Sequence, residues 1–242
     1  MIPLVHDFAG HTVLVFGGGT VGERKARRFA TEAHVVVVSP AFADSLTTGE
    51  SAVSEATPAT WTPADEDAGV ELVRDTPTPA TVADWVAAVD PVLVVAATDD
   101  EGVNDAAEGA ARERGALVNR TDQSGERDAG SVVVPATVDD GSVSVAVTTG
   151  GASPALSKYL RERLEAELDG AGGMAALTRE LRAELKRSDR SPAERRDAVR
   201  AVVRSPDVWK ALRTGTVNAR QVAEDVIQNE TTEPLDAEEA RR

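Results

Sequence analysis

Three glycines near the N-terminus stand at the spacing that binds the phosphates of a dinucleotide. Gly17, Gly19 and Gly22 fit the pattern G-x-G-x-x-G, with an apolar run at 12–16 before them and a helical stretch at 23–30 after them. In such a turn the first glycine permits the chain reversal, the second lets the backbone approach a pyrophosphate, and the third lets the helix lie close to the strand. The helix start also offers free N–H groups to an anion. We therefore expect a dinucleotide site, with a tight turn that binds nothing as the alternative.

The end of the second apolar run, 35–38, is where a ribose-binding carboxylate usually stands in such proteins. This sequence has Ser39 and Pro40 there instead. The Ser39 hydroxyl can form one hydrogen bond to a ribose, and backbone groups near Pro40 and Ala41 can form others. Since no arginine follows this run to bind a 2′-phosphate, the sequence favours NAD over NADP.

Polar residues follow two later apolar runs. The segments are Thr98-Asp99-Asp100, after the run 92–97, and Asn119-Arg120-Thr121-Asp122, after the run 116–119. Open α/β sheets bind their ligands at the carboxyl ends of strands, so both segments are candidates for the site, with Thr98 at the cofactor. Asp122 is the best candidate for a general base. The alternatives are that Thr98, Asp99 or Asp100 only caps a helix and that Asp122 lies on a surface loop.

A second predicted helix is preceded by residues with hydroxyl side chains and by two glycines, whose backbone no side chain covers. Thr149, Gly150 and Gly151 lead to Ser153 as an expected N-cap and to Pro154 as the first helical residue. The hydroxyls and the exposed backbone would face a ligand bound at the N-terminus of this helix. Helix capping alone would also explain the segment.

Apolar runs and helical stretches alternate through the first 130 residues, which is typical of an α/β fold. The predicted strands are 12–16, 35–38, 71–73, 92–97 and 116–119, and the predicted helices are 23–30, 43–46, 81–89 and one that runs from its cap at 98–100 to about 114. The rest of 41–69 is expected to be loop and sheet edge. We expect a Rossmann-like parallel sheet domain that binds the nucleotide over residues 1–130.

The pattern changes after Gly130. Residues 131–137 and 142–148 alternate around a turn at 139–141, which predicts an antiparallel hairpin. A hairpin is marginal by itself, so it needs a helix to pack on or a second copy of the chain. We expect a β-hairpin region for dimerisation and the active site over 131–167, a C-terminal helical domain over 168–229, with breaks at 170–173, 188–191 and 205–206, and a disordered tail over 230–242.

Composition excludes several classes of protein. The 242 residues contain no cysteine, so disulfides, thiolate zinc sites, iron–sulfur clusters and cysteine nucleophiles are excluded. The three histidines show no metal-ligand spacing, and we expect no metal site. The longest apolar runs are far shorter than the ~20 residues of a membrane helix, and the N-terminus shows no leader. We expect a cytoplasmic protein that does not bind membranes.

The charge is strongly acidic. Lys and Arg number 26 and Asp and Glu 41, which gives a net charge of −15, and only four of the basic residues are lysine. Nucleic acid is therefore not expected as a partner. An acidic surface with arginine in place of lysine suggests adaptation to high salt, as in halophiles. An ordinary acidic protein is the alternative.

In this order, the segments make the chain similar to the precorrin-2 dehydrogenase family, which also forms the N-terminal module of siroheme synthases. The similarity covers residues 3–164. It includes Pro3-Leu4, the stretch 15–27, the Ala-Ala-Thr-Asp-Asp run at 96–100 with Asn104 after it, Asn119, Asp122, Pro135 and the stretch 149–154. Weaker similarity continues at 194–196 and 208–209.

The resemblance implies an activity and a set of site residues. The reaction would be NAD-dependent removal of two hydrogens from precorrin-2 to give sirohydrochlorin, in a homodimer. The family's general base or metal-handling aspartate falls on Asp122. Nucleotide contacts would fall on Thr20 and Val21 in the glycine turn and on Pro40 and Ala41. Substrate contacts would involve Asn119, Arg120, Thr149, Gly150, Gly151 and Ser153.

Two positions depart from the family's pattern. Gly22 stands where many members have alanine, a difference that we expect to be harmless. Thr149 stands where some members have serine, which keeps a hydroxyl but puts any serine-specific regulation in doubt.

The substrate adds a requirement of its own, because precorrin-2 carries eight carboxylates in this family's chemistry. An acidic chain must then concentrate positive charge where the substrate binds. Arg120, Arg127, Lys158 and Arg161, with the helix start at Ser153, are the candidates. The alternative is that these cations lie on the surface, are solvated and bind no substrate.

Two other functions stay open at this point. A bifunctional enzyme would also insert Fe²⁺ into sirohydrochlorin, since Asp122 could serve both steps. A regulatory NAD-sensing module without catalysis shares the strand–glycine–helix start, but such modules usually keep an acidic residue after the second strand.

Overall fold

The chain forms two compact units, Met1–Val134 and Pro135–Arg242, and each is described by itself. A computed structural model describes residues 3–47, 53–63, 69–123, 128 and 130–230. The predicted tail, 230–242, lies outside the described residues except for Glu230, which ends the last helix. The first unit ends four residues after the predicted boundary at 130, and the further division at 167 stays a prediction.

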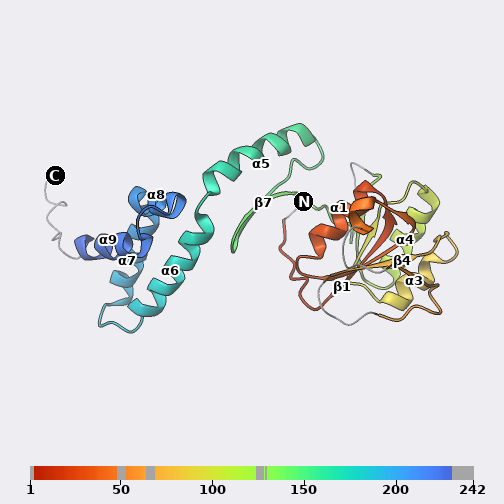
Figure 1. Cartoon of the computed structure of the whole chain (residues 1–242), viewed down its shortest axis with the longest axis horizontal. Coiled ribbons are helices and arrows are strands. Elements are labelled where there is room, and N and C mark those ends of the chain that lie inside the picture. The colour runs from red at the N-terminus through yellow and green to blue at the C-terminus, as the bar shows by residue number, and fades with distance from the viewer. Residues whose placement is uncertain (1–2, 48–52, 64–68, 124–127, 129, 231–242) are drawn as a thin grey trace. The chain divides into compact units, whose positions relative to one another are not determined.

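The first unit is a parallel sheet of six strands with helices on both faces (Figure 1). Its strands are β1 (Thr12–Gly18), β2 (His34–Phe42), β3 (Val53–Glu55), β4 (Gly69–Arg74), β5 (Leu93–Ala96) and β6 (Leu117–Arg120). Its helices are α1 (Thr20–Phe29), α2 (Asp44–Thr47), α3 (Val82–Val89) and α4 (Glu101–Glu113). The strand order β3-β4-β2-β1-β5-β6 reverses between β1 and β5. The crevice at the carboxyl ends of these two strands is therefore the expected ligand site.

Alternating side chains of β1 explain why both faces of the sheet are covered. Val13 and Val15 pack with Phe29 of α1 on one face, whereas Leu14 and Phe16 pack with Trp85 of α3 on the other. All four β1 side chains are fully buried. A strand that is apolar at every position is typical of a parallel sheet between two layers of helices. This arrangement confirms the predicted α/β class.

One local prediction in this unit needs correction. The predicted strand 131–137 does not exist in its first half: Ser131 forms an isolated parallel bridge with Val118, and the partly buried Val132 and Val134 pack against the core of the sheet. Their alternation reflects burial against the first unit and not pairing within a hairpin. The prediction of loop and sheet edge over the rest of 41–69 agrees with β3, a three-residue strand that pairs with β4 and is the edge strand of the described sheet.

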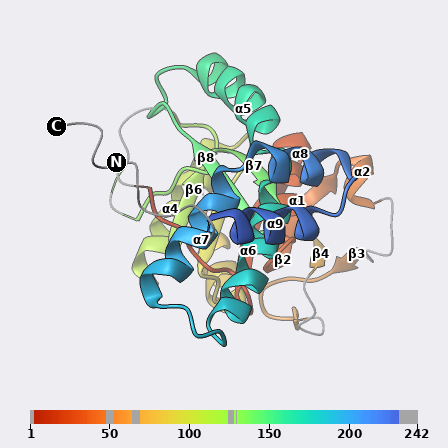
Figure 2. The same cartoon turned by 90° about the vertical axis from the view of Figure 1, so that its left-hand side faces the viewer.

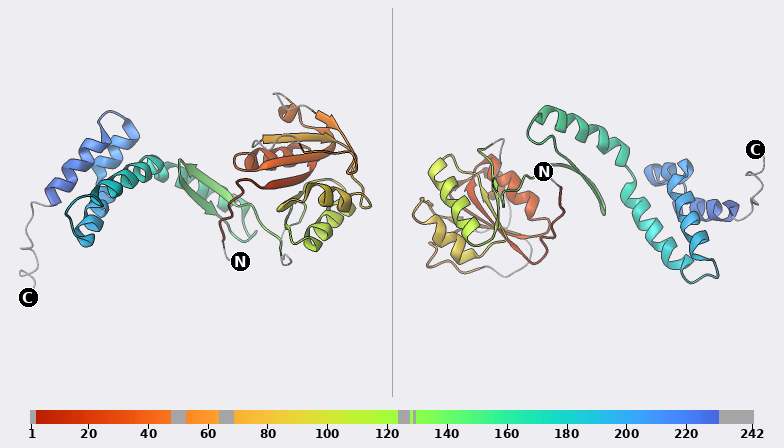
Figure 3. Two further views of the ribbon diagram at one scale, coloured as in Figure 1. Left: turned by 90° about the horizontal axis from the view of Figure 1, so that it is seen from below. Right: turned by 180° about the vertical axis from the view of Figure 1, so that it is seen from behind.

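Over residues 135–230, the second unit contains the hairpin and five helices (Figures 2 and 3). These are β7 (Ala136–Asp140), β8 (Val143–Val147), α5 (Pro154–Leu168), α6 (Ala171–Leu185), α7 (Pro192–Arg204), α8 (Pro206–Thr214) and α9 (Ala219–Glu230). The hairpin turns at Gly141, whose φ is +56°, and it contacts α5. The predicted hairpin is therefore confirmed, with a later start, and α5 packs on it, while the alternative of a second copy of the chain stays a prediction.

Helices α6 to α9 surround a core of their own. Leu181, Val202, Val208 and Ile227, one from each helix, are buried in it. The predicted breaks coincide with the observed helix ends: Gly170 precedes α6 in the left-handed region, and Ser191 and Ser205 cap α7 and α8. A fourth break was not predicted, at Gly215, where φ is +62°. None of the described helices is long and apolar enough to cross a membrane.

Candidate functional site

The glycine turn joins β1 to α1 through two close backbone contacts. Gly17 has a φ of +106°, and a Cβ on it would lie 2.3 Å from the carbonyl oxygen of Ala97. A Cβ on Gly22 would lie 1.9 Å from the carbonyl oxygen of Gly17. Both positions therefore need glycine in this structure. An alanine at Gly22, the residue of many family members, would force the backbone of this turn to shift, whereas the glycine of this chain fits it.

Gly19 is different, because nothing in the protein requires a glycine there. Its φ of −75° and ψ of −177° suit any residue, and a Cβ on it would meet no atom within 4 Å. It precedes α1 without a side-chain cap, and the next two residues, Thr20 and Val21, are exposed. The open space and the uncapped helix start fit the pyrophosphate of a dinucleotide.

The end of β2 places the predicted ribose contacts beside an arginine that the sequence did not suggest. Ser39 is buried and its hydroxyl donates to the carbonyl oxygen of Ala41 at 2.7 Å, while Pro40 and Ala41 are exposed. Arg74, at the end of β4, donates to the carbonyl oxygen of Pro40 at 2.9 Å and lies over the ring of Phe42. The Ser39 hydroxyl is thus used within the turn, which leaves backbone groups for a ribose.

Asp122 lies just after β6 and is held by two residues. Arg120 donates from Nε to Oδ1 of Asp122 at 2.9 Å and from a terminal nitrogen to Oδ2 at 2.7 Å, which makes a bidentate pair. Asn104 of α4 donates to Oδ2 at 3.2 Å. The Arg120 hydrogen bonds are the main reason why the pKa of Asp122 is lowered to about 2, with a smaller contribution from Asn104. The carboxylate is therefore ionised at neutral pH.

Arg120 is buried and its guanidinium is engaged within the chain. Its side chain is 1% exposed. Its remaining terminal nitrogen, NH1, donates to Asp105 at 2.6 Å and to Glu108 at 3.0 Å, both on α4. The pairing with Asp122 raises the pKa of the guanidinium above its ordinary value. Its nitrogens are thus engaged by three carboxylates of the chain, which argues against the predicted contact of Arg120 with substrate carboxylates, and that contact stays a prediction.

Thr98, after β5, is tied to the same network by Asn104. The Thr98 hydroxyl donates to Oδ1 of Asn104 at 2.8 Å, and Nδ2 of Asn104 donates to the Thr98 carbonyl oxygen at 2.9 Å. Asn104 is 1% exposed. The cap of α4 is Asp100, which accepts from the backbone of Gly102 and Val103. The residue after β5 and the residue after β6 therefore share one buried amide.

Three members of this network were not identified as site residues from the sequence: Asn104, Asp105 and Glu108. Only Asn104 was noted, as part of the family resemblance. A signal was present, because residues 100, 104 and 108 recur at the helical spacing of four. That spacing puts them along one side of α4.

Asn119 is buried and has a structural contact. Its Nδ2 donates to the carbonyl oxygen of Val132 at 2.7 Å and the residue is 3% exposed, while its Oδ1 finds no partner among the described residues. The amide thus holds the segment after β6 against the sheet. The predicted substrate contact of Asn119 stays a prediction, which this burial does not favour.

The segment 149–153 belongs to the second unit. The Thr149 hydroxyl accepts from the Ser153 N–H at 3.1 Å and lies 3.1 Å from the Ser157 hydroxyl, and Ser153 caps α5 through the Leu156 N–H. Gly150 and Gly151 both have positive φ, and a Cβ on either would meet nothing within 4 Å. The predicted cap is confirmed. The predicted substrate contacts of this segment stay a prediction.

The other cations predicted to bind substrate carboxylates are less available than expected. Lys158 is 3.9 Å from Glu162, and Arg161 pairs with Glu165 at 2.9 Å. Arg127 lies outside the described residues. Among the described residues, no group of three or more His, Asp or Glu side chains is placed to hold a metal ion.

Comparison with known proteins identifies relatives along the whole chain. Residues 4–136 match the family described as "Putative NAD(P)-binding", and residues 140–167 match "Sirohaem biosynthesis protein central". A precorrin-2 dehydrogenase of Methanosarcina barkeri is 29% identical over 233 residues, which cover 94% of each chain. A siroheme synthase of Nitrosospira multiformis is 33% identical over 98% of this chain but only 46% of its own length.

A solved structure has the same fold. The chain matches SirC, a precorrin-2 dehydrogenase, with a TM-score of 0.64 and 22% sequence identity, over 94% of this chain and 100% of the other. At this level of identity the match supports the α/β sheet, hairpin and helices of this chain, and it adds nothing about individual residues.

Proposed function

Because this chain belongs to the family of precorrin-2 dehydrogenases and siroheme synthase N-terminal modules, we propose that it removes two hydrogens from precorrin-2 to give sirohydrochlorin, with NAD as the cofactor. The observation that carries the proposal is the arrangement at one edge of the sheet. β1, β5 and β6 are neighbours, and they end in the glycine turn, Thr98 and Asp122. A nucleotide turn and an ionised carboxylate thus lie at the carboxyl ends of adjacent strands.

The glycine turn is suited to hold the cofactor. Gly17 and Gly22 let β1 and α1 approach each other closely, and Gly19 leaves the helix start open. The N–H groups at the start of α1 would bind the pyrophosphate, and backbone groups at Pro40 and Ala41 would bind a ribose. When bound, NAD⁺ supplies the hydride acceptor.

Asp122 is the proposed acceptor of the proton that leaves with the hydride. Arg120 and Asn104 fix the direction of its carboxylate and keep it ionised. The same pairing makes Asp122 a weak base, so a proton that it accepts is soon released. Its side chain is 29% exposed, which lets water take that proton.

A homodimer built by the second unit is part of the proposal. None of the described residues of α5 is buried, although Leu156, Tyr159 and Leu160 lie at spacings of three and four on this helix. Their exposed fractions are 46%, 53% and 37%. Such a row of apolar side chains is stabilised by burial against a second copy. We place the enzyme in the cytoplasm, where a chain without cysteine needs no oxidising environment.

The test is an anaerobic incubation of the protein with precorrin-2 and NAD⁺ in high salt, which follows NADH and the pigment spectrum. The wild-type chain should form both NADH and sirohydrochlorin. Asp122→Asn should keep NAD binding and lose turnover by about 10²–10⁴-fold, the contribution of a positioned base. Asp84→Asn, at an exposed position of α3, is the matched control. Normal turnover by Asp122→Asn would remove Asp122 from this role, and no NADH from the wild type would refute the activity.

A further inference from the structure

A groove in the second unit gathers positive charge in a chain that is otherwise acidic. It lies between α6 and α7 and has a volume of about 550 Å³. It is lined by four apolar residues, Leu185, Pro192, Val199 and Val203, and by six cations, Arg182, Lys186, Arg195, Arg196, Arg200 and Arg204. No acidic residue lines it among those described. The stretch 179–204 has nine basic and five acidic residues, 9 − 5 = +4, within a chain of net charge −15.

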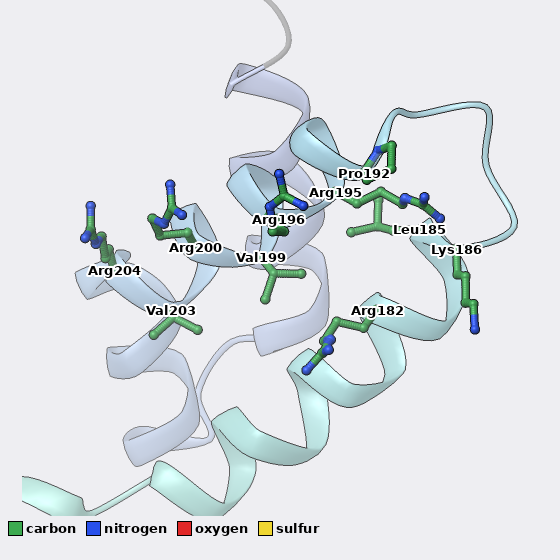
Figure 4. Close-up of a pocket in the computed structure, with 10 residues that line it drawn as sticks. All are labelled: Arg182, Leu185, Lys186, Pro192, Arg195, Arg196, Val199, Arg200, Val203 and Arg204. Atoms are coloured by element: carbon green, nitrogen blue, oxygen red, sulfur yellow. The ribbon is translucent and has the colours of Figure 1, made fainter.

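The side chains are arranged as an apolar strip with cationic edges (Figure 4). Arg196, Arg200 and Arg204 stand in a row along one side of α7, while Arg182 and Lys186 extend from α6. Val199 and Val203 point from α7 into the space between the two helices. The residues of α7 recur at spacings of three and four, which places them along one face of that helix.

Most of these cations pair with no acidic residue in the part of the chain that the structure describes. Among the described residues, Arg200 is the one groove cation in an ion pair, with Asp197 at 2.8 Å. Nearby acids are engaged elsewhere: Glu180 and Glu184 pair with Arg220 of α9, and Glu194 bonds back to Ser191 in the capping box of α7. The groove therefore presents uncompensated positive charge to solvent.

We infer that this groove binds an amphiphilic polycarboxylate, and that its ligand is the tetrapyrrole on which the enzyme acts. A carboxylated tetrapyrrole combines an apolar macrocycle with negative groups around its rim, which matches an apolar strip between rows of cations. The cations proposed for this purpose from the sequence are buried, paired or outside the described residues. The choice of ligand, although not the charge of the groove, rests on the proposed function.

Binding is tested with uroporphyrin, a stable tetrapyrrole with eight carboxylates, by fluorescence titration of the full chain at constant KCl. Arg196→Gln/Arg204→Gln should lower the affinity of the groove by about tenfold or more, because two charge-assisted contacts are lost. Arg179→Gln/Arg187→Gln is the matched control. It removes the same charge from the same stretch, but neither residue lines the groove, and its affinity should change less than twofold.

Three results would overturn the inference: no uroporphyrin binding by the wild type, an unchanged affinity of the groove variant, or an equal loss in the control. Displacement of uroporphyrin by octaglutamate at equal concentration would also overturn it, because the groove would then recognise acidic peptides. NADH formation from precorrin-2 is measured on the same samples. A wild type that binds uroporphyrin through the groove but forms no NADH refutes the proposed function alone.

Discussion

Arg120 in the first unit and Arg196 in the second carry the same guanidinium in opposite surroundings. Arg120 is 1% exposed and bonds to Asp105, Glu108 and Asp122, whereas Arg196 is exposed and pairs with no described acid. In the first unit the charge is neutralised within the chain and serves to hold one carboxylate. In the second unit no described acid neutralises the charge, so it is available to a bound ligand. The position of an arginine in the sequence says little about which of these roles it has.

Removal of each arginine gives the strongest test of this contrast. Arg120→Met should lower the free energy of unfolding by about 3–5 kcal/mol, because it leaves partly buried carboxylates without their counter-charge. Arg196→Met, the matched surface change, should stay within about 0.5 kcal/mol. Urea unfolding followed by tryptophan fluorescence measures both. Similar losses in the two variants would contradict the distinction.

Asn104 is expected to have the next largest effect. Asn104→Ala removes the donor to Asp122 and one of the two acceptors near the Thr98 hydroxyl, the other being the Asp100 carbonyl oxygen, and it should cost about 1–3 kcal/mol of unfolding free energy. Gln221→Ala, which removes an exposed amide that bonds to Asp225, is the control and should change little. If Asn104→Ala is as stable as the control, the buried amide does not hold the two loops together.

The pH dependence of stability gives a smaller effect with a definite sign. The pKa of Asp122 is about 2 in the folded chain and lies below its ordinary value of 3.8 because of the bonds from Arg120. Its contribution to stability is therefore present above pH ~4 and is lost as the pH falls toward ~2. The difference in unfolding free energy between the wild type and Asp122→Asn should shrink over this window. A difference that stays constant from pH 6 to 2 would contradict the pairing.

Gly19 should show almost no effect on stability and a clear effect on binding. Gly19→Asp should change the unfolding free energy by less than about 0.5 kcal/mol, because the position is open, yet it places a carboxylate where the pyrophosphate would lie. NAD⁺ affinity, measured by calorimetry, should fall at least tenfold. Gly109→Asp on α4, where a Cβ also meets nothing within 4 Å, is the control. Unchanged NAD⁺ affinity would make the turn a structural feature only.

The elements of the first unit were predictable because their signals are local. A run such as Val35–Val38 is buried at every position, and the three glycines act within one turn. The burial of Arg120 was not predictable in this way. It depends on Asp105 and Glu108, which precede it by fifteen and twelve residues and reach it only when α4 packs beside β6. The segment 131–134 gave a wrong strand prediction for the same reason, because its alternating apolar residues pack against the sheet of the first unit.

Helix α4 connects every side chain that holds Asp122. Asn104 bonds to Asp122 directly, and Asp105 and Glu108 hold Arg120 against it. A transient opening of this single helix would release the carboxylate while β1, β2 and β5 remained folded, because local opening needs less free energy than global unfolding. The Asp122 carboxylate would then keep its active position only for as long as α4 stays folded. On heating, we expect activity to decay, and amide exchange to quicken in α4, before the sheet melts.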